Sequence, residues 1–389
     1  MINWQERLST RAQNLPPSGI RRFFDLAEKM GDVISLGVGE PDFVTPWHIR
    51  EAGLYALERG MTAYTANAGL LALRISIAQY LENRFGLRYA PEGNLLVTVG
   101  GSEAIDLALR VLVRPQDRVL VPEPTYVAYR PLIQLAGGEP VSVPLRVENG
   151  FQLTEEDLLR GSESGARILI LCNPNNPTGS VVARPRLERL AKIIEGLDLL
   201  VIADEIYAEI LYDVDYTSLA SCSGMQERTV VIGGFSKAFA MTGWRLGYAA
   251  GPEPLIAAML RVHQYAMLCA PVMAQMAAIE ALSQGLADVS AMVAEYDRRR
   301  RLIVRGLREL GLPTTDPDGA FYVFPDIRGT GLSSEAFAED LLRQGKVAVV
   351  PGNVFGSAGE GFVRCSYATG ISQIERALER IREYLRAGT

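Results

Sequence analysis

Polar and charged residues follow directly after several apolar, strand-like runs of this sequence. Four segments share this arrangement. They are VTVGGSEAI at 97–105, CNPNNPTG at 172–179, VIADEIYAE at 201–209 and GGFSKAFAMTGWRLGY at 233–248. Ligands of open α/β sheets bind in the crevice outside the carboxyl ends of the strands. We therefore expect these polar groups to gather at one edge of a sheet and to act on one small molecule.

The last of these segments places two cations, Lys237 and Arg245, among glycines and large apolar residues. Lysine and arginine are rarely buried unless they are paired. A partly desolvated lysine has a lowered pKa and acts as a nucleophile toward carbonyl groups. The arginine fork suits a planar oxyanion such as phosphate. The alternative is that both are solvated surface cations.

Gly101 and Ser102 open a helical pattern after the first apolar run. Free backbone N–H groups at a helix N-terminus, with glycines that allow close approach, make an anion site. The segment lacks the spacing of the dinucleotide-binding and P-loop motifs. The alternative is an ordinary tight turn. Turn chemistry also explains most of Asn173, Asn175 and Asn176, although the turn does not need all three, and one of their amides is free to hydrogen-bond an oxygen in a cleft.

Asp204 ends an apolar strand, where a carboxylate is costly unless it is paired or hydrogen-bonded. Asp204 and Tyr207 are both placed to face one cleft, but a helix N-cap is an equal alternative for the aspartate. Pyridoxal phosphate requires the whole set: an anion site for its phosphate, a lysine for its aldehyde and a carboxylate for its ring nitrogen. We therefore predict this cofactor.

The middle of the chain alternates apolar runs with helical patterns. The runs are NLLVTV (94–99), DRVLVPEP (117–124), EPVSVPL (139–145), ARILILCNP (166–174), LLVIADE (199–205) and TVVIGGF (229–235). Helical patterns follow at 102–113, 126–137 and 185–197. This alternation predicts a doubly wound α/β fold with a mostly parallel sheet. A long helix at 292–310 and short antiparallel-type strands follow, so we expect a large domain at 45–285 and a smaller α+β domain at 1–44 and 286–389.

Composition narrows the class of function. The chain has 389 residues, 48% of them hydrophobic, and a formal net charge of -6, which argues against a nucleic-acid partner. No apolar run has membrane-spanning length, no signal-peptide core is present and the cysteines lack metal-site spacing, so we expect a cytoplasmic protein. With only His48 and His263, the chain has no histidine-rich metal site and little scope for Ser–His chemistry.

Read together, these segments resemble class I/II aminotransferases. The segment GFSKAFAMTGWRLGY resembles the motif to which this family attaches pyridoxal phosphate. The other motifs of the family appear in the family's usual order across essentially the whole chain. They are SGIRRFFDLAEKMGDVISLGVGEPDF, YTANAGLLALR, NPNNPTG, ADEIY and VRCSYA. The resemblance implies the fold type I architecture, transamination, amino acid and 2-oxo acid substrates, and a homodimer with active sites at the subunit interface. The aromatic and aspartate aminotransferases are the most similar branch.

The resemblance also assigns roles around the cofactor ring. It makes Lys237 the residue that attaches the cofactor and Asp204 the partner of the ring nitrogen. Tyr207 and Asn176 would hydrogen-bond the ring hydroxyl oxygen. Tyr126, in PEPTYVAY, would stack on one face of the ring.

Further roles concern the other ring face, the phosphate and the substrate. Ile206 would support the second face of the ring, while Gly101, Ser102 and Arg245 would bind the phosphate. Tyr64 would reach the phosphate of the neighbouring subunit. Arg364 would bind the substrate α-carboxylate, with Gly39 and Asn176 nearby.

One departure from the family pattern concerns the phosphate. A hydroxyl residue often stands three positions before the lysine, but this chain has Gly234 there, which leaves Ser236 as a substitute. No cation stands at Ser102, where one branch of aspartate aminotransferases has a lysine. Arg21 and Arg22 are alternatives for reading a distal carboxylate, unless they belong to a solvated helix face.

We therefore expect a broad-range aminotransferase that accepts bulky neutral side chains, with glutamate and 2-oxoglutarate as the common pair. The alternatives are an alanine or N-acetyl-diaminopimelate aminotransferase, and a carbon–sulfur β-lyase on the same fold. A regulator built on this fold would need an added DNA-binding domain with a basic surface, for which the chain has no spare segment.

Overall fold

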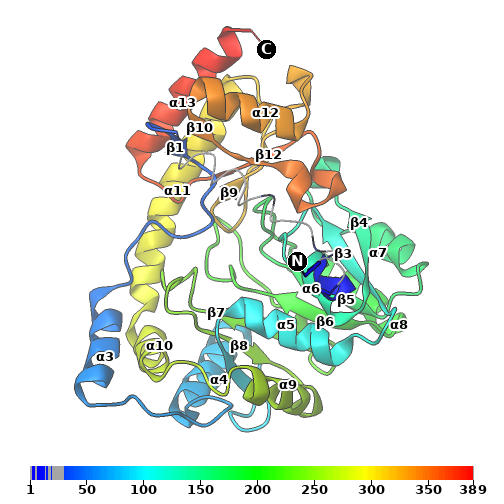
Figure 1. Cartoon of the computed structure of the whole chain (residues 1–389), viewed down its shortest axis with the longest axis vertical. Coiled ribbons are helices and arrows are strands. Elements are labelled where there is room, and N and C mark those ends of the chain that lie inside the picture. Colours follow the sequence, from blue (N-terminus) through cyan, green and yellow to red (C-terminus); the bar gives the residue numbers. More distant parts are fainter. Residues whose placement is uncertain (1, 5–6, 14, 16–18, 20–29, 389) are drawn as a thin grey trace.

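A seven-stranded sheet forms the centre of the computed structural model, which describes residues 2–4, 7–13, 15, 19 and 30–388 (Figure 1). The strand order is β2-β8-β7-β6-β5-β3-β4, and β8 alone runs antiparallel to its neighbours. The bounds are β2 Leu95–Thr98, β3 Arg118–Glu123, β4 Glu139–Pro144, β5 Ile168–Cys172, β6 Leu200–Asp204, β7 Thr229–Gly234 and β8 Gly247–Ala250. The doubly wound, mostly parallel sheet predicted from the sequence is confirmed.

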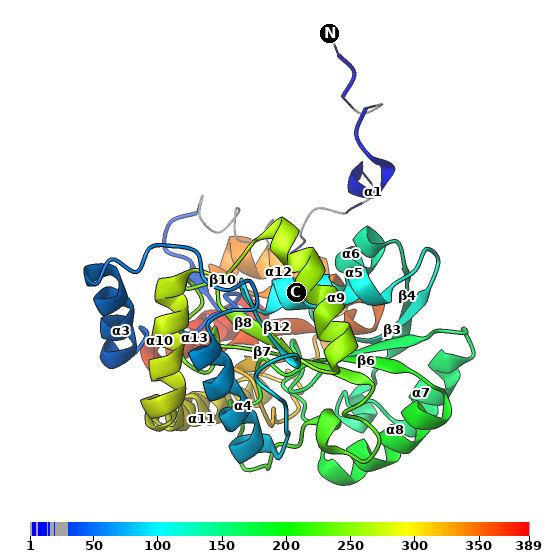
Figure 2. The same ribbon diagram turned by 90° about the horizontal axis from the view of Figure 1, so that it is seen from below.

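Helices cover both faces of this sheet, which explains why its strands read as continuous apolar runs (Figure 2). In β5, Ile168 and Ile170 pack into the cluster under α5 and α9, while Leu169 and Leu171 pack into the cluster with α7 and α8. Asp204 follows Ile202 by two residues, and side chains two apart share a face of a strand. The Asp204 carboxylate therefore leaves β6 on the face that α5 covers.

The described helices of this region and of the N-terminal segment lie between residues 10 and 284. They are α1 Thr10–Gln13, α3 Trp47–Glu58, α4 Leu71–Phe85, α5 Gly101–Leu112, α6 Tyr129–Ala136, α7 Glu155–Ser162, α8 Arg184–Gly196, α9 Glu253–Ala266 and α10 Val272–Gln284. The helix predicted from Tyr126 begins at Tyr129. No helix follows Asp204, so the N-cap interpretation of that residue is wrong.

The C-terminal part of the chain forms two small sheets. One is antiparallel with the order β11-β12-β9, and the other pairs β1 of the N-terminal segment with β10 in parallel. The strands are β1 Ile34–Ser35, β9 Tyr322–Val323, β10 Val347–Ala348, β11 Val350–Pro351 and β12 Val363–Ser366, and the helices are α11 Leu286–Glu309, α12 Ser334–Asp340 and α13 Ile371–Arg386. The division into two domains stays a prediction.

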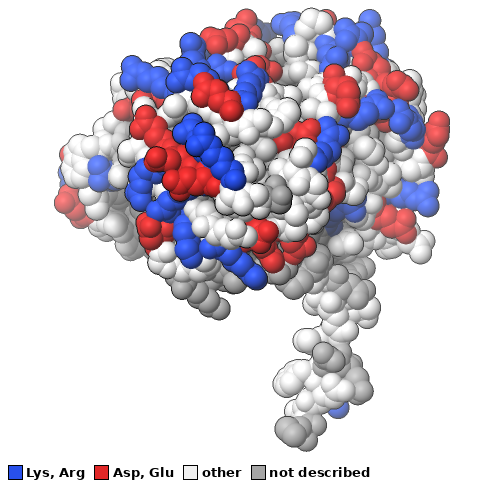
Figure 3. Space-filling model, turned by 90° about the horizontal axis from the view of Figure 1, so that it is seen from above, with Lys and Arg blue, Asp and Glu red and all other residues white. Residues whose placement is uncertain are grey.

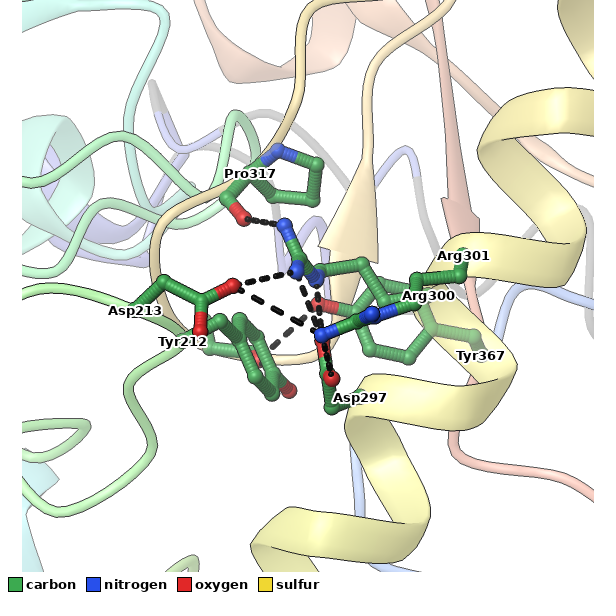
Figure 4. A network of polar contacts seen from close by, with 8 residues as sticks. Tyr212, Asp213, Asp297, Arg300, Arg301, Pro317 and Tyr367 are labelled. Atoms are coloured by element: carbon green, nitrogen blue, oxygen red, sulfur yellow. Dashed lines mark hydrogen bonds and ion pairs between the residues drawn. The ribbon is translucent and has the colours of Figure 1, made fainter.

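Helix α11 carries a run of four arginines at 298–301. Figure 4 shows how part of this run is neutralised. Arg300 contacts Asp297 and Asp213, and it donates to the carbonyl oxygen of Pro317 at 3.2 Å. Arg301 contacts the same two carboxylates. These contacts tie α11 to the segment that follows β6 and pair Arg300 and Arg301 with carboxylates.

Charged residues of both signs are interspersed on the face drawn in Figure 3. None of the described helices combines the length and the apolar composition needed to cross a membrane. Likewise, no cluster of three or more His, Cys, Asp or Glu side chains in the described part of the chain is arranged to hold a metal ion.

We predict that Gly247→Ala destabilises the protein by about 2 kcal/mol, because overpacking a filled site costs about 1–3 kcal/mol. A Cβ at Gly247 would lie 2.6 Å from the backbone of Gly100 and Gly101. Gly243→Ala is the matched control, since a Cβ there meets no atom within 4 Å. Denaturant unfolding of both variants tests this, and equal midpoints would contradict the close approach of β8 to the start of α5.

Candidate active site

A cavity of about 420 Å³ lies at the carboxyl ends of the sheet strands and gathers residues from both parts of the chain. Its lining residues are Val38, Gly39, Glu40, Gly101, Ser102, Ile105, Tyr126, Cys172, Asn176, Asp204, Ile206, Tyr207, Ser236, Lys237, Thr242, Arg245, Tyr322 and Arg364. Every site residue predicted from the sequence is in this set except Tyr64. The four segments singled out in the sequence therefore do meet at one edge of the sheet.

Lys237 lies just beyond β7, in the turn that leads back to β8. Its Nζ donates to the carbonyl oxygen of Gly39 at 2.7 Å. Burial lowers the pKa of Lys237 to about 8; the carboxylate of Glu40 opposes this shift, and the cations Arg364 and Arg245 add to it. At pH 7 roughly a tenth of this amine is therefore unprotonated, far more than for an ordinary lysine, and attack on a carbonyl carbon requires that form.

Asp204 ends β6 and is buried. Its Oδ1 accepts from the backbone N–H of Ile206 at 3.3 Å, and its Oδ2 accepts from the hydroxyl of Tyr129 at 2.5 Å. Burial raises the pKa of Asp204, while the hydrogen bonds from Tyr129 and Ile206 and the charge of Lys237 lower it. Burial outweighs the other contributions, so the pKa of Asp204 stays above its ordinary value, and the two hydrogen bonds and Lys237 reduce this shift toward the neutral acid.

Arg364, on β12, is buried and brings the C-terminal part to the cavity. Its Nη1 donates to Oδ1 of Asn176 at 3.0 Å, and its Nη2 donates to the carbonyl oxygen of Gly37 at 2.7 Å. The guanidinium lies 4.4 Å from the ring centroid of Tyr322. Its buried Nε has no hydrogen-bond partner among the described residues. A cation held in this way offers a fixed fork to a carboxylate.

Aromatic residues complete the walls. The hydroxyls of Tyr207 and Tyr322 lie 2.8 Å apart. Burial raises the pKa of Tyr207 well above its ordinary value, so its phenol keeps the proton and remains a donor. Tyr126 packs edge-on against Tyr129, with ring centroids 5.5 Å apart.

The start of α5 forms a cradle. Gly100 has a φ of 83° and caps the helix without a side chain, so N–H groups of the first turn point outward. A Cβ at Gly100 would lie 2.6 Å from Nη2 of Arg245. The backbone of Gly101, the side chain of Ser102 and the guanidinium of Arg245 all line the cavity at this end. Arg245 lines the cavity while much of its side chain stays exposed to solvent, and its role as a phosphate partner stays a prediction.

Gly234 lies close to Ile206 and β8. A Cβ there would lie 2.7 Å from Cδ1 of Ile206 and 3.3 Å from Cα of Gly247. A hydroxyl side chain at this position would therefore require the end of the Ile206 side chain to move. Ser236 is buried and lines the cavity, which leaves it available for the substitute role expected from the sequence.

Tyr64 is the predicted site residue that the described cavity does not include. Tyr64 is 82% exposed and does not line the cavity. Its assigned contact is with a second subunit, so its role stays a prediction. Arg21 and Arg22 lie outside the described residues.

Several cavity residues were missed by sequence reasoning. They are Val38, Glu40, Ile105, Cys172, Thr242 and Tyr322. Tyr322 lies on β9, far along the chain from the segments with strand-end polar residues, and no local pattern places it at the sheet. Glu40 and Thr242 belong to segments that the sequence analysis discussed, but nothing in the sequence marks them as site residues. In the structure the Thr242 hydroxyl donates to Oε2 of Glu40 at 3.1 Å. This contact forms only in the folded chain, so the sequence could not reveal it.

Known proteins resemble this chain over nearly its whole length. The sequence signature of the family "Aminotransferase class I and II" matches residues 31–381. The protein YugH of Bacillus subtilis is 55% identical over 382 residues, which cover 98% of this chain and 99% of YugH. Aromatic-amino-acid aminotransferase 2 of Thermococcus litoralis is 44% identical over 382 residues, covering 97% and 98% of the two chains.

A solved structure resembles this chain in fold as well as in sequence. Aspartate aminotransferase from Thermus thermophilus with maleate is 38% identical and superimposes with a TM-score of 0.93, covering 97% of this chain and 99% of that one. This chain belongs to the class I and II aminotransferases. It is an aminotransferase of fold type I, close to the aromatic and aspartate enzymes, and it acts on amino acids and 2-oxo acids with pyridoxal phosphate.

The residues present fit that cofactor. The Gly100 cradle, which a Cβ would fill, suits a phosphate next to Arg245. The amine of Lys237 and the carboxylate of Asp204 line the same cavity, as an aldehyde and a ring nitrogen on one small molecule would require. A bound cofactor supplies a ring that accepts the electron pair released when a bond to the substrate Cα breaks.

We predict that the rate at which pyridoxal phosphate attaches to the apoenzyme rises with pH and levels off above about pH 8. The reason is that the pKa of Lys237 is lowered to about 8 by burial, so the reactive free amine is already the major form above that pH. Stopped-flow absorbance of the cofactor measures this rate.

Two variants complete the test. Lys237→Ala should abolish both the visible absorbance of the attached cofactor and transamination. Lys192→Met, on α8 and away from the cavity lining, should keep the wild-type profile. A midpoint near pH 10.5, the ordinary value for lysine, would contradict a desolvated Lys237.

Proposed function

We propose that this aminotransferase takes the amino group from a broad range of L-amino acids, with aromatic donors favoured, and passes it to 2-oxoglutarate. The observation that carries the proposal is the content of the cavity. Lys237, Asp204 and Arg364 line one space, and its remaining walls are mainly apolar or aromatic.

The proposal gives the chain's own residues the following roles. Asp204 would be the partner of the cofactor ring nitrogen, and Tyr207 and Asn176, which line the same cavity, would donate to the ring oxygen. Lys237 takes the proton from the substrate Cα through its Nζ, because its lowered pKa makes it a base near neutral pH. A positioned base of this kind contributes roughly 10²–10⁴-fold to the rate.

Arg364 binds the α-carboxylate that all amino acid substrates share. Asn176 and Gly37 hold two of its nitrogens, and the ring of Tyr322 covers one face of the guanidinium. The fork is therefore oriented before a substrate arrives, which reduces the entropy lost on binding.

The side-chain end of the site favours neutral groups. Among the described lining residues, the cations are Lys237, Arg245 and Arg364, and all have other roles. Val38, Ile105 and the aromatic residues suit an aromatic side chain. Aspartate and 2-oxoglutarate carry a second carboxylate, which needs a cation from outside this set. Arg21 and Arg22 are the candidates in this chain.

We predict that aromatic amino acids exceed aspartate in kcat/KM when each is assayed as a donor to 2-oxoglutarate. Arg364→Ala should lower kcat/KM for every donor by about 100-fold, since removal of one partner of a buried charged pair costs about 2–5 kcal/mol. Arg228→Ala, at a pair with Asp198 away from the cavity, is the control. A clear preference for aspartate, or an Arg364→Ala effect confined to acidic donors, would overturn the assignment.

We further propose a homodimer in which each subunit completes the site of the other. Its support is the exposure of large apolar side chains on α3 and near the end of α9. They are Trp47, Tyr55, Leu57, Tyr265 and Met267. A second copy would cover them and bring Tyr64 of the partner subunit toward the phosphate cradle.

A complementation assay tests the shared site. We predict that Lys237→Ala and Tyr64→Ala proteins, each impaired alone, regain activity when they are unfolded and refolded together. A hybrid dimer then holds one site that carries neither substitution, and random pairing restores roughly a quarter of wild-type activity. Activity equal to the average of the two separate variants would contradict a site completed by Tyr64 of the partner subunit.

A further inference from the structure

Tyr129 is a buried residue next to the site that sequence reasoning did not select. It begins α6, it is 0% exposed and it does not line the cavity. Its hydroxyl nevertheless lies 2.5 Å from Oδ2 of Asp204. The contact therefore reaches the reacting region through the carboxylate.

The direction of this hydrogen bond is fixed by the chemistry of the pair. Burial and the neighbouring carboxylate raise the pKa of Tyr129 well above its ordinary value, so the phenol keeps its proton. A carboxylate accepts hydrogen bonds and does not donate them while it is ionised. Tyr129 is thus the donor, and a donor stabilises the charged form of Asp204.

Few other groups do this for Asp204. The N–H of Ile206 donates to the other oxygen at the longer distance of 3.3 Å. The adjacent buried carboxyl of Glu205 is turned toward the hydroxyl of Ser218, at 2.6 Å. It provides no hydrogen bond to Asp204 among the described contacts.

We propose that Tyr129 is a positioning residue for the reaction, whose hydroxyl holds the Asp204 carboxylate ionised and turned toward the ring nitrogen of the cofactor. The proposal rests on the role of Asp204 in the proposed function. Tyr129 touches neither substrate nor cofactor, and it acts only through Asp204.

A purely structural role is the competing explanation. The ring of Tyr129 packs against Tyr126 and belongs to the apolar cluster under α5. Tyr129→Phe keeps the ring and removes only the hydroxyl. A structural role therefore predicts a change in stability alone, whereas the proposal predicts a change that depends on the ring nitrogen of the ligand.

The test compares two ligands of the apoenzyme: pyridoxal phosphate and its analogue with carbon in place of the ring nitrogen. Tyr129→Phe should weaken the binding of pyridoxal phosphate by about tenfold or more, the typical weight of a hydrogen bond to a charged group. Binding of the carbon analogue should change little. In addition, pyridoxal phosphate affinity should begin to fall at a higher pH than in the wild type as the solution is acidified, because the pKa of Asp204 rises further without its donor.

Tyr80→Phe is the matched control. Tyr80 is also a tyrosine that donates to a buried carboxylate, that of Glu209 at 2.7 Å, but it lies on α4 and outside the cavity lining. It should leave the ratio of the two affinities unchanged. Equal losses for both ligands in Tyr129→Phe, or no loss for either, would overturn the proposal.

Asp204→Asn separates this proposal from the one on which it rests. If Asp204→Asn retains the preference for pyridoxal phosphate over the analogue, the role of Asp204 fails. If Asp204→Asn loses that preference and Tyr129→Phe keeps it, only the role of Tyr129 fails. If Tyr129→Phe does not fold, Tyr129→3-fluorotyrosine keeps the shape with a more acidic donor, and the pH at which affinity falls should then move to lower values. An unmoved pH would contradict the proposal.

Discussion

The free-energy cost of burying charged side chains determines how the cavity of this protein is built. One cavity holds a carboxylate, an amine and a guanidinium with little access to solvent, and an isolated buried charge is strongly unfavourable. Each is therefore held by donors or acceptors from another part of the chain. Asp204 takes a hydrogen bond from Tyr129, Lys237 donates to Gly39, and Arg364 is held by Asn176 and Gly37. The contacts join the N-terminal segment, the main sheet and the C-terminal strands around the site.

The same contacts tune the chemistry. Burial lowers the pKa of Lys237 and raises that of Asp204, so each shift disfavours the charged form. For the lysine this is useful, because transamination needs a free amine. For the aspartate it is harmful, since the ring nitrogen needs a negative partner, and the structure compensates with a hydrogen bond. The same burial therefore favours the function of Lys237 and opposes that of Asp204.

The sheet and most of the site were predictable because they leave local signals. Residues that end apolar strands, such as Asp204 and Asn176, are conspicuous, and parallel strands bring such ends together. Strand β8 left a weaker signal, because Gly247–Ala250 is short, has Tyr248 as its one bulky residue and runs antiparallel. Tyr129 and Tyr322 left none. Their roles depend on which residues of distant elements they meet, and a tyrosine at the start of a helix or in a short strand is unremarkable.

The attachment point of the cofactor is the central claim, and this chain allows a direct test. Its lysines are few: Lys29, Lys192, Lys237 and Lys346. Borohydride reduction of the holoenzyme fixes the cofactor to the lysine that holds it, and peptide mass spectrometry identifies that residue. The account predicts the added mass on the peptide that contains Lys237 and on no other. Label on Lys29, Lys192 or Lys346, or no label in an active enzyme, would contradict it.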